Sequence, residues 1–367
     1  MRAGVAFSFR RRLGARRTTG LLALVLGLLA GFAAPASARS AATLGDGVFN
    51  AIDKTLPGYG KDVANVRNYL VHDMALGWYV VAAVETNDLT QARLAADQLL
   101  TTRYKGGNAS PGWGIGWAWD AFGDGTINPA HTVYGISTAV AVRGLFDLYD
   151  ATQEAKYRDA ALEALEFYYE RSFIRSTNYI GDVGVFWYSN TAYDRSWRVF
   201  NVISMLMGQY ARAYAQTGDS TWKDVATRCF RYLWSHRKTT ATGLMWDYEF
   251  SGSKYKGGND GVHASFVVQG MLDYEKYLPD LYDIAPAVEY LSSYEPGTQS
   301  VWSLAMLIFT LTEGGKTARA AQLRDDRLPA YRVTGYRYGN RPSDKSVYPR
   351  QMTQLAAGLL RLEAAAG

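Results

Sequence analysis

Two kinds of helical pattern alternate along the chain. In the first kind, apolar residues fill nearly every position, as in 133–149, 199–214 and 300–311. In the second kind, which includes 154–170 and 219–235, apolar residues recur every three or four positions and leave one charged face. The first pattern predicts helices that are buried on all sides, and the second predicts helices with one face in water.

An internal repeat shows how these helices are joined. Residues 148–170 align with 213–235 at a constant offset of 65, which pairs Tyr149 with Tyr214 and Asp159 with Asp224. Each segment predicts a helix, a tight turn and a second helix. A weaker copy occupies 82–100, and two later segments continue the series to a last helix near 348–363. The sequence therefore predicts about eleven helices, close to six helical hairpins.

Hairpins that pair one buried helix with one amphipathic helix close naturally into a ring. We therefore predict an all-α fold, an (α/α)₆ toroid with the buried helices forming an inner barrel, in one domain spanning 44–365. An open superhelix is the alternative, but these units are long and irregular for it. Turns within hairpins are short, whereas the connections between hairpins are long and rich in Gly, Trp, Tyr and Asp, at about 104–130, 172–197, 237–262 and 326–347.

The long connections must gather at one mouth of such a ring. Because the inner helices run parallel, the same mouth collects their N-termini, whose free N–H groups favour an anionic ligand. A secretory signal is predicted in 1–38, with six arginines before an apolar run and a cut after Ala38, so we expect a secreted or periplasmic protein without stable membrane association after cleavage.

Removing this signal changes the charge of the chain. The mature protein keeps 33 of the 39 basic residues against 34 acidic ones, so its net charge is −1 and nucleic acid is not an expected partner. The single Cys229 excludes an internal disulfide. No zinc spacing, phosphate loop or complete calcium loop is present, so we predict neither a metal nor a cofactor.

Aromatic and titratable residues concentrate in the long connections. Flat rings with polar edges suit the faces of sugars, although some of them will pack the protein itself. The residues that we predict to bind substrate are Trp113, Trp117, Trp119, His131, Trp187, Arg195, Arg198, Asn201, Trp246 and Asp260. The segment 331–350, with five basic residues among four tyrosines, either forms the last mouth loop and holds an acidic chain or is a solvated surface loop.

Several of these segments resemble a known family. TAVAVRGLFDLYDAT, FWYSNTAYDRSWRVFN and MWDYEF followed by NDGVHASF are similar to the helical domain of bacterial glucuronyl C5-epimerase-like proteins, within the six-hairpin carbohydrate enzymes. The resemblance covers about residues 120–280. It implies an acidic polysaccharide or oligosaccharide as substrate, with site residues Trp187, Tyr188, Asn201, Trp246, Tyr248, Asp260 and His263.

The reaction that the resemblance implies is proton abstraction at a uronate, which gives C5-epimerisation or β-elimination. It needs a base, an acid and groups that hold the carboxylate. We predict that the catalytic residues come from Tyr188, Tyr248, His263, Tyr134, Glu249 and Asp247. A tyrosine base requires a lowered pKa, which the nearby arginines are expected to supply.

Two other classes of function remain open at this point. A glycoside hydrolase would use two carboxylates, from the candidates Asp73, Asp120, Asp124, Asp194, Asp247, Glu249 and Asp260. The segment 71–78, VHDMALGW, is weakly similar to unsaturated-glucuronyl hydrolases, although His72 and Asp73 are also explained as part of the first inner helix. A noncatalytic glycan-binding protein is the third alternative.

Overall fold

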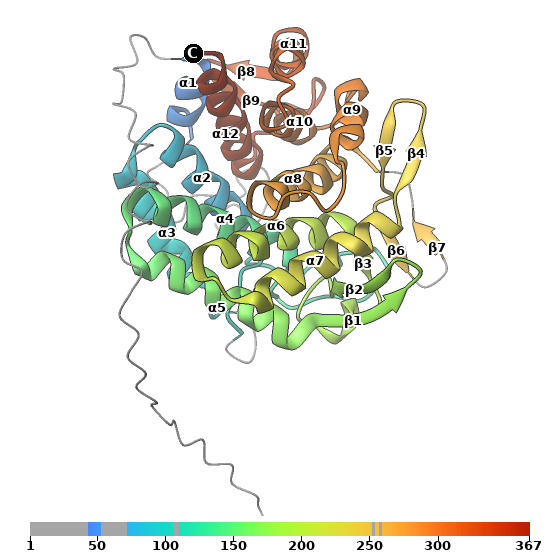
Figure 1. Ribbon diagram of the computed structural model, residues 1–367. Coiled ribbons are helices and arrows are strands. Elements are labelled where there is room, and N and C mark those ends of the chain that lie inside the picture. Colours follow the sequence, from blue (N-terminus) through green and yellow to red (C-terminus); the bar gives the residue numbers. More distant parts are fainter. Residues whose placement is uncertain (1–42, 53–71, 106–109, 252–253, 257–258) are drawn as a thin grey trace, which may run out of the picture. The chain divides into compact units, whose positions relative to one another are not determined.

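Six helices form an inner ring in the computed structural model, which describes residues 43–52, 72–105, 110–251, 254–256 and 259–367 (Figure 1). The inner helices are α2 (Asp73–Glu85), α4 (Gly135–Thr152), α6 (Phe200–Thr217), α8 (Gly261–Tyr277), α10 (Val301–Glu313) and α12 (Pro349–Ala366). Each inner helix packs against the next, and α12 packs against α2. The ring is therefore closed, as the alternation of helical patterns predicts.

A second set of helices covers the outside of this ring. These are α1 (Leu44–Asn50), α3 (Leu89–Thr102), α5 (Ala155–Ser172), α7 (Ser220–Ser235), α9 (Ala285–Ser293) and α11 (Thr317–Arg327). The 65-residue offset is confirmed, because α4 and α6 both contain 18 residues and end at Thr152 and Thr217. Turns of two or three residues, such as 153–154 and 218–219, join α2, α4, α6 and α10 to their outer partners, whereas the longer segment 278–284 joins α8 to α9.

Helix α1 completes the sixth hairpin from the other end of the chain. It packs against α12, and the backbone N–H of Gly45 donates to Glu363 Oε1 at 2.9 Å (Figure 1). The sequence pattern predicts about eleven helices and leaves α1 out, since seven residues are too few for a helical period to show. The predicted signal, residues 1–38, lies outside the described residues.

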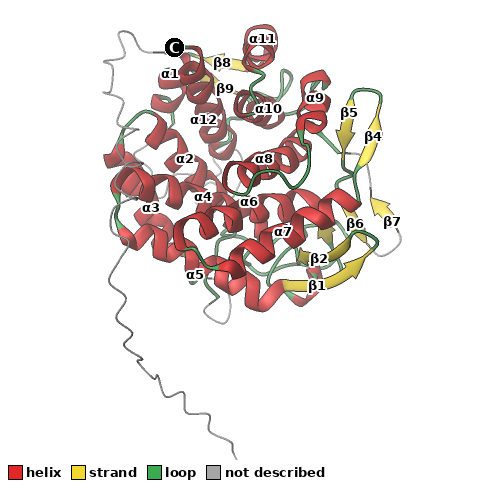
Figure 2. Ribbon diagram, viewed as in Figure 1, coloured by secondary structure: helices red, strands yellow, loops and turns green. Residues whose placement is uncertain are grey.

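In the described part of the chain, short strands lie in the connections and at the edge of the helices (Figure 2). They form two-stranded hairpins and one three-stranded sheet, β3-β6-β7. Their bounds are β1 (Phe173–Asn178), β2 (Gly181–Phe186), β3 (Arg198–Val199), β4 (Lys238–Thr240), β5 (Gly243–Met245), β6 (Glu249–Ser251), β7 (Lys254–Lys256), β8 (Arg332–Thr334) and β9 (Arg337–Tyr338). The fold is thus the predicted all-α toroid with β-hairpins on its connections.

A buried ionic cluster spans the interior of the ring. Arg143 on α4 reaches across to the opposite helices, where its Nη1 donates to Asp273 Oδ2 on α8 at 2.8 Å and its Nη2 donates to Glu313 Oε1 on α10 at 3.0 Å. Gln269 and Gln209 donate to the same Asp273 carboxylate at 3.1 and 3.2 Å. Because a buried guanidinium requires such partners, the cluster fixes how these helices pass one another.

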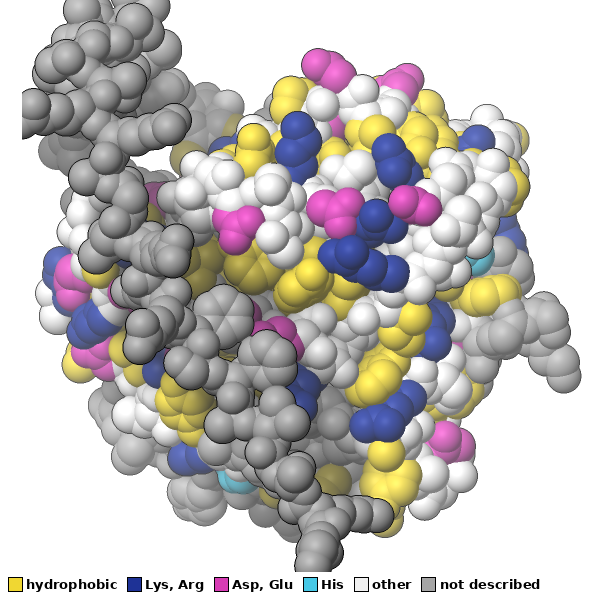
Figure 3. Space-filling view, turned by 60° about the horizontal axis from the view of Figure 1, so that its bottom comes forward, with side chains coloured by type: hydrophobic (Ala, Val, Ile, Leu, Met, Phe, Trp, Pro, Cys, Tyr) yellow, Lys and Arg dark blue, Asp and Glu magenta, His cyan; other side chains and the backbone are white. Residues whose placement is uncertain are grey.

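The outer surface differs from this interior in both composition and charge. On the face visible in Figure 3, basic and acidic side chains are interspersed. Outer helices are linked by exposed ion pairs such as Lys156 with Asp97 at 2.8 Å. None of the helices in the described part of the chain is long and apolar enough to cross a membrane.

Helices α6 and α8 approach each other closely at Gly270, and this contact yields a prediction. A Cβ added at Gly270 would lie 2.1 Å from the Ser204 carbonyl oxygen, a backbone atom that cannot turn aside. We expect Gly270→Ala to lower the free energy of unfolding by about 1–3 kcal/mol, despite the higher helix propensity of Ala. Urea unfolding measures it, and a variant as stable as the native protein would contradict this close packing.

Candidate active site

A cavity of about 510 Å³ lies where the N-termini of the inner helices converge. Its volume lies in the range of small-ligand sites. The residues that line it are His72, Met74, Ile115, Trp117, Trp119, Ala121, Tyr134, Ile136, Ser137, Tyr188, Asn201, Tyr248, His263, Phe266, Trp302, Asn340, Tyr348, Pro349, Arg350 and Gln351. The predicted mouth therefore exists and contains a cavity of suitable size.

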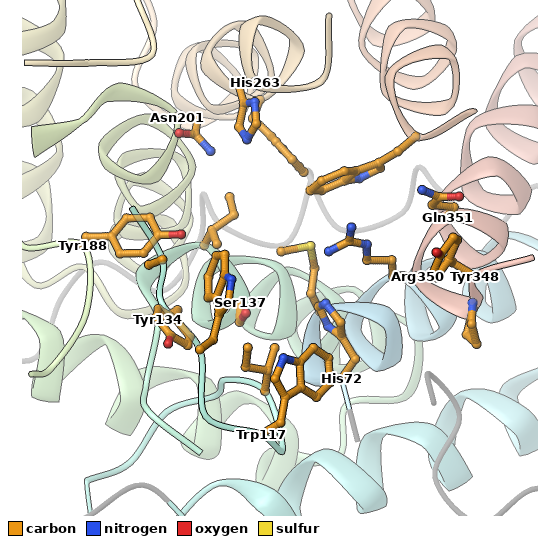
Figure 4. Close-up of a pocket in the computed structure, with 18 of the residues that line it drawn as sticks. His72, Trp117, Tyr134, Ser137, Tyr188, Asn201, His263, Tyr348, Arg350 and Gln351 are labelled. Atoms are coloured by element: carbon orange, nitrogen blue, oxygen red, sulfur yellow. The ribbon is translucent and has the colours of Figure 1, made fainter. Parts of the chain in front are cut away.

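Every inner helix contributes a polar or aromatic side chain to this cavity from its first turn or N-cap. The six residues, in chain order, are His72, Tyr134, Asn201, His263, Trp302 and Arg350. Figure 4 shows Asn201 and His263 on one side of the cavity and His72 and Trp117 on the other. The closed ring thus brings together residues that are up to 278 positions apart, from His72 to Arg350.

His263 is held in place by Asp260, the N-cap residue of α8. Asp260 Oδ1 accepts the backbone N–H of His263 at 2.9 Å and lies 2.7 Å from His263 Nδ1. Burial acts to raise the pKa of Asp260, but the hydrogen bonds from His263 and its charge lower it overall. Asp260 therefore orients the imidazole, and with Nδ1–H directed to the carboxylate, Nε2 is the nitrogen available as a base.

His72 is a second imidazole in the cavity, and its surroundings keep it neutral. Burial, followed by the charge of Arg350, lowers the pKa of His72 to about 3. Such a group is a weak base at neutral pH but still offers a hydrogen-bond donor and an acceptor. Its Nδ1 has no hydrogen-bond partner among the described residues.

The three candidate tyrosines are suited to donate protons rather than to accept them. Burial raises the pKa of Tyr134, Tyr188 and Tyr248 above the ordinary value, so each stays protonated. This corrects the expectation of a tyrosine base with a pKa lowered by arginines, because desolvation is the largest influence on all three phenols and raises their pKa. The Tyr188 hydroxyl points into the cavity (Figure 4), whereas the Tyr134 hydroxyl is buried, near Asn128 and Asp194.

Arg350 is the one Lys or Arg residue among those that line the cavity in the described structure. Its guanidinium carbon lies 4.4 Å from the centre of the Trp302 ring. The next residue, Gln351, donates through Nε2 to Asn340 Oδ1 at 2.8 Å, and the Asn340 carbonyl accepts the N–H of Val301 at 2.7 Å. These bonds tie the first turns of α10 and α12 together.

The glycine-rich loop places its three tryptophans differently. Trp117 and Trp119 line the cavity, and Trp119 keeps 36% of its surface exposed. Trp113, in contrast, is buried, and its Nε1 donates to the Leu99 carbonyl at 2.9 Å. It packs the protein core and does not line the cavity, which corrects its prediction as a substrate-binding residue.

Several other predicted residues lie outside the cavity lining. Arg195 lies over the Trp187 ring at 4.3 Å, Arg198 belongs to β3, and His131 is in the loop before α4 with positive φ. Trp246 is buried and donates through Nε1 to the Leu233 carbonyl at 2.7 Å. The structure therefore does not bring Trp187, Arg195, Arg198, His131 and Trp246 together with His263.

Carboxylates are missing from the described residues that line the cavity. Asp247 pairs with Lys238 at 2.5 Å, and Glu249 is fully buried in β6. The other candidates have local roles as well: Asp120 accepts backbone N–H groups of its own turn, Asp124 bonds Thr126, and Asp194 accepts from Asn128 at 2.8 Å. Asp247 and Glu249, predicted as catalytic, are thus not placed at the cavity.

The cavity residues that the sequence analysis did not predict as catalytic or substrate-binding include His72, Trp302, Arg350 and Gln351. A usable signal existed for three of them. His72 lies in the VHDMALGW segment, and Arg350 ends the basic segment 331–350, which does lead into the mouth. Trp302 occupies the second position of its inner helix, as Asn201 does. The first turn of every inner helix was therefore the informative pattern.

Comparison with known proteins supports the fold. No family model and no curated protein matches the chain. An inactive α-1,6-mannanase variant of family 76 from Salegentibacter sp., in complex with α-1,6-mannotriose, matches with a TM-score of 0.61 at 12% identity, over 88% of this chain and 97% of that one.

Two further structures have different activities in their descriptions. A family 105 glycoside hydrolase from C. acetobutylicum has a TM-score of 0.53 at 13% identity, over 88% of this chain and 98% of that one. A D-mannose isomerase has a TM-score of 0.60 at 9% identity, over 88% and 97%. Likenesses at this level of identity establish the fold, the six-hairpin (α/α)₆ toroid, and leave the reaction to the site itself.

Asp73, next to His72, gives a prediction about pH. Its Oδ2 accepts the N–H of Gly114 at 3.1 Å and its Oδ1 accepts from Thr102 at 2.9 Å, yet burial raises its pKa from 3.8 to about 6. The native state therefore keeps this proton more tightly than the unfolded chain does. Its contribution to stability is largest below about pH 4 and falls as the pH rises to about 6, by about 3 kcal/mol.

Asp73→Asn should remove this pH dependence. The amide can still accept from Gly114 and donate to the Thr102 hydroxyl, so folding should survive. We expect the difference in unfolding free energy between variant and native protein to shift in favour of the variant from pH 4 to pH 7, measured by urea unfolding. A difference that stays constant, or shifts toward the native protein, would show that Asp73 ionises at its ordinary pKa or below.

Proposed function

We propose that this protein is an exported carbohydrate-active enzyme that abstracts a proton at a uronate of an acidic polysaccharide or oligosaccharide, giving C5-epimerisation or β-elimination. The observation that carries the proposal is the chemistry of the cavity. Its described lining contains two imidazoles, four phenols and a guanidinium, but no carboxylate. These are groups for moving a proton on and off carbon, whereas glycoside hydrolysis uses two carboxylates.

His263 is the proposed base. The hydrogen at C5 of a uronate is acidified by the neighbouring carboxylate, and removing it gives an enolate-like intermediate that needs donors and cations around it. Asp260 holds His263 with Nε2 available and stabilises the imidazolium that forms when the proton arrives. The Asp–His pair therefore supplies both orientation and charge compensation for this step.

Tyr188 and Tyr248 are the proposed proton donors. Because their pKa values are raised by burial, both hydroxyls carry a proton at neutral pH. Returning a proton to C5 on the other face completes epimerisation, while protonating the oxygen that leaves from C4 completes β-elimination. The Asn201 amide, on the same side of the cavity as His263, offers a hydrogen bond to the sugar (Figure 4).

The comparisons support the carbohydrate part of this proposal. The neighbours are described as enzymes of mannan, as a family 105 glycoside hydrolase and as an isomerase of mannose. The inactive mannanase carries two adjacent aspartates replaced by asparagine. The only adjacent aspartates in this sequence, Asp325 and Asp326, are exposed on the outer helix α11. No adjacent pair of aspartates therefore occurs among the described residues that line the cavity.

Hydrolysis remains the competing activity, since two of the reported neighbours are hydrolases. One experiment separates the reactions: the purified protein is incubated in heavy water with uronate-containing and neutral glycans. Deuterium uptake at carbon without new reducing ends means epimerisation. An increase in ultraviolet absorbance together with new reducing ends means elimination. New reducing ends without either signal mean hydrolysis and would refute the proposal, and no change with tight glycan binding would indicate a noncatalytic binder.

Changes at the Asp–His pair test the proposed base. We expect His263→Gln to lower kcat by about 100-fold or more, because it removes the general base. Asp260→Asn should cause a smaller loss of kcat with little change in KM, because it disturbs only the orientation and charge of the imidazole. Steady-state kinetics on the responsive glycan measures both, and a His263→Gln enzyme with native kcat would exclude this role.

A second set of variants separates phenols from carboxylates. Tyr188→Phe and Tyr248→Phe remove one hydroxyl each and should lower turnover, with at least one falling by about 100-fold. Asp247→Asn serves as the matched control, since this carboxylate pairs with Lys238 and does not line the cavity. If Asp247→Asn abolished turnover while both phenylalanine variants kept it, the hydrolase interpretation would replace ours.

A further inference from the structure

We propose that a buried polar cluster outside the cavity lining positions the aromatic side chains on one side of the cavity, and that Asp194 is thereby a positioning residue for sugar binding and proton transfer. The cluster, which we call the polar latch, consists of Asn128, Ser189, Thr191 and Asp194. The inference rests on the proposed function for what the positioned side chains do, but the latch itself can be tested without turnover.

The polar latch joins two of the long connections. Asn128 lies in the connection before α4, and the other three residues lie in the connection before α6. Asn128 Nδ2 donates to Asp194 Oδ2 at 2.8 Å, and the Thr191 hydroxyl donates to Asn128 Oδ1 at 2.7 Å. The Ser189 hydroxyl donates to the same Asp194 oxygen. One carboxylate oxygen thus accepts a hydrogen bond from each connection.

The polar latch is buried, although it belongs to connecting segments. Asn128 and Ser189 have no exposed surface, and Asp194 is 1% exposed. Both polar atoms of the Asn128 amide have partners within the latch. Connecting segments ordinarily run over the surface, where water competes for their polar side chains. A buried network whose members are paired instead specifies one arrangement of the segments that it joins.

The latch reaches Trp119 through the backbone. The N–H of Trp119 donates to the Asn128 carbonyl at 3.0 Å, and the N–H of Asn128 donates to the Trp119 carbonyl at 2.9 Å. Side chains of residues paired in this way stand on the same face of the two segments. Because the latch holds the Asn128 amide, it also holds the backbone that carries the Trp119 ring into the cavity lining. That ring stays partly exposed, which suits stacking on a sugar.

The latch reaches Tyr188 through the next residue, Ser189. Ser189 pairs with Tyr134 in an isolated β-bridge. The Tyr134 ring makes edge-to-face contacts with the rings of Trp119 and Tyr188, at 5.5 and 5.6 Å between ring centres. Figure 4 shows Tyr134 and Tyr188 on the same side of the cavity. The three rings therefore pack as one aromatic wall, whose position depends on both connections.

The position of this aromatic wall matters for the proposed reaction. A sugar stacked on Trp119 presents its carbon–hydrogen bond to His263 at one angle, and Tyr188 must return the proton along a fixed direction. Misplacing a reacting group by about 1 Å can cost about 100-fold in rate. Trp119 and Tyr188 lie in connections, so the inner helices do not hold these two rings directly. The polar latch supplies the missing constraint.

Hydrogen exchange followed by mass spectrometry tests the latch in the purified protein without any ligand. Asp194→Asn replaces one acceptor oxygen with an N–H₂ group, which weakens the hydrogen bonds that the two connections share. We expect backbone exchange about tenfold or more faster in both 113–131 and 187–197, with α4 and α6 unchanged. Asp182→Asn is the matched control, since Asp182 lies in the same connection but is exposed and bonds Thr177 instead.

Exchanging the two residues tests the same contact by rescue. Asn128→Asp alone places two carboxylates where a 2.8 Å hydrogen bond stood, and it should loosen both segments as well. The double variant Asn128→Asp with Asp194→Asn restores one amide beside one carboxylate, with the direction of the hydrogen bond reversed. Its exchange should return most of the way to the native rates. Thermal unfolding checks that each variant is folded.

Steady-state kinetics on the responsive glycan tests the role in the reaction. Each single variant should raise KM and lower kcat/KM by about tenfold or more, and the double variant should recover most of this loss. A mere loss of folded enzyme would lower the apparent kcat and leave KM unchanged, so the rise in KM identifies positioning. Asp182→Asn should keep native values of both constants.

The proposal is overturned if Asp194→Asn loosens only one of the two segments or neither, if Asp182→Asn loosens both, if the double variant is no better than the single ones, or if the single variants keep native KM. These outcomes are distinct from failure of the proposed function. Coupled loosening and rescue, without deuterium uptake at carbon on any uronate, would support the latch and defeat the proton-transfer reaction. Native turnover of a uronate by every latch variant would support proton transfer and overturn the positioning role.

Discussion

The position of the cavity depends on one buried interaction that crosses the inner ring. Arg143 leaves α4 and pairs with Asp273 on α8 and Glu313 on α10, two helices that are not its neighbours in the ring. Burying a guanidinium is costly unless acceptors pair with it, and both Nη groups of Arg143 have carboxylate partners, so this contact tolerates few relative positions of the three helices. Arg361 on α12 adds a contact to Glu313 at 3.5 Å. These ion pairs link α4, α8, α10 and α12 across the interior of the ring.

The cluster fixes the axial positions of the inner helices, and each helix carries that position to its N-terminal end at the mouth. Asp273 is ten residues beyond His263 on the same helix, a distance of about 15 Å along its axis. Because helices are stiff, the axial position set at Asp273 also sets the height of His263 at the mouth. The same reasoning applies to Glu313 with Trp302, and to Arg361 with Arg350. First-turn side chains from six helices therefore face one cavity, which we propose to be the site of an anionic sugar.

The sequence predicted features that follow from a repeated pattern, but it did not predict which distant helices pair or which way a single side chain points. Apolar periodicity and the 65-residue offset predicted the buried and outer helices and the common mouth. They could not show that α1 would supply the last outer helix, because its pairing with α12 joins opposite ends of the chain. Glycine spacing identified the loop of Trp113, Trp117 and Trp119, but no local pattern told which ring would turn inward to the Leu99 carbonyl.

The site was harder to predict than the fold for a related reason. His263, Asn201 and the tyrosines were found because they follow aromatic connections, whereas His72 and Arg350 belong to segments with an ordinary structural explanation. The pKa values of the tyrosines depend on burial that only the packed structure reveals. The signal segment and its export remain predictions from the sequence.

The central claim is that a carbon–hydrogen bond next to a carboxylate breaks in this cavity. The most direct measurement compares turnover of a uronate substrate carrying hydrogen at C5 with the same substrate carrying deuterium there. The account predicts that the deuterated substrate reacts several-fold more slowly, since the proton transfer to His263 limits or contributes to the rate. Equal rates, together with oxygen from labelled water appearing at the anomeric carbon of the product, would contradict it and identify a hydrolase.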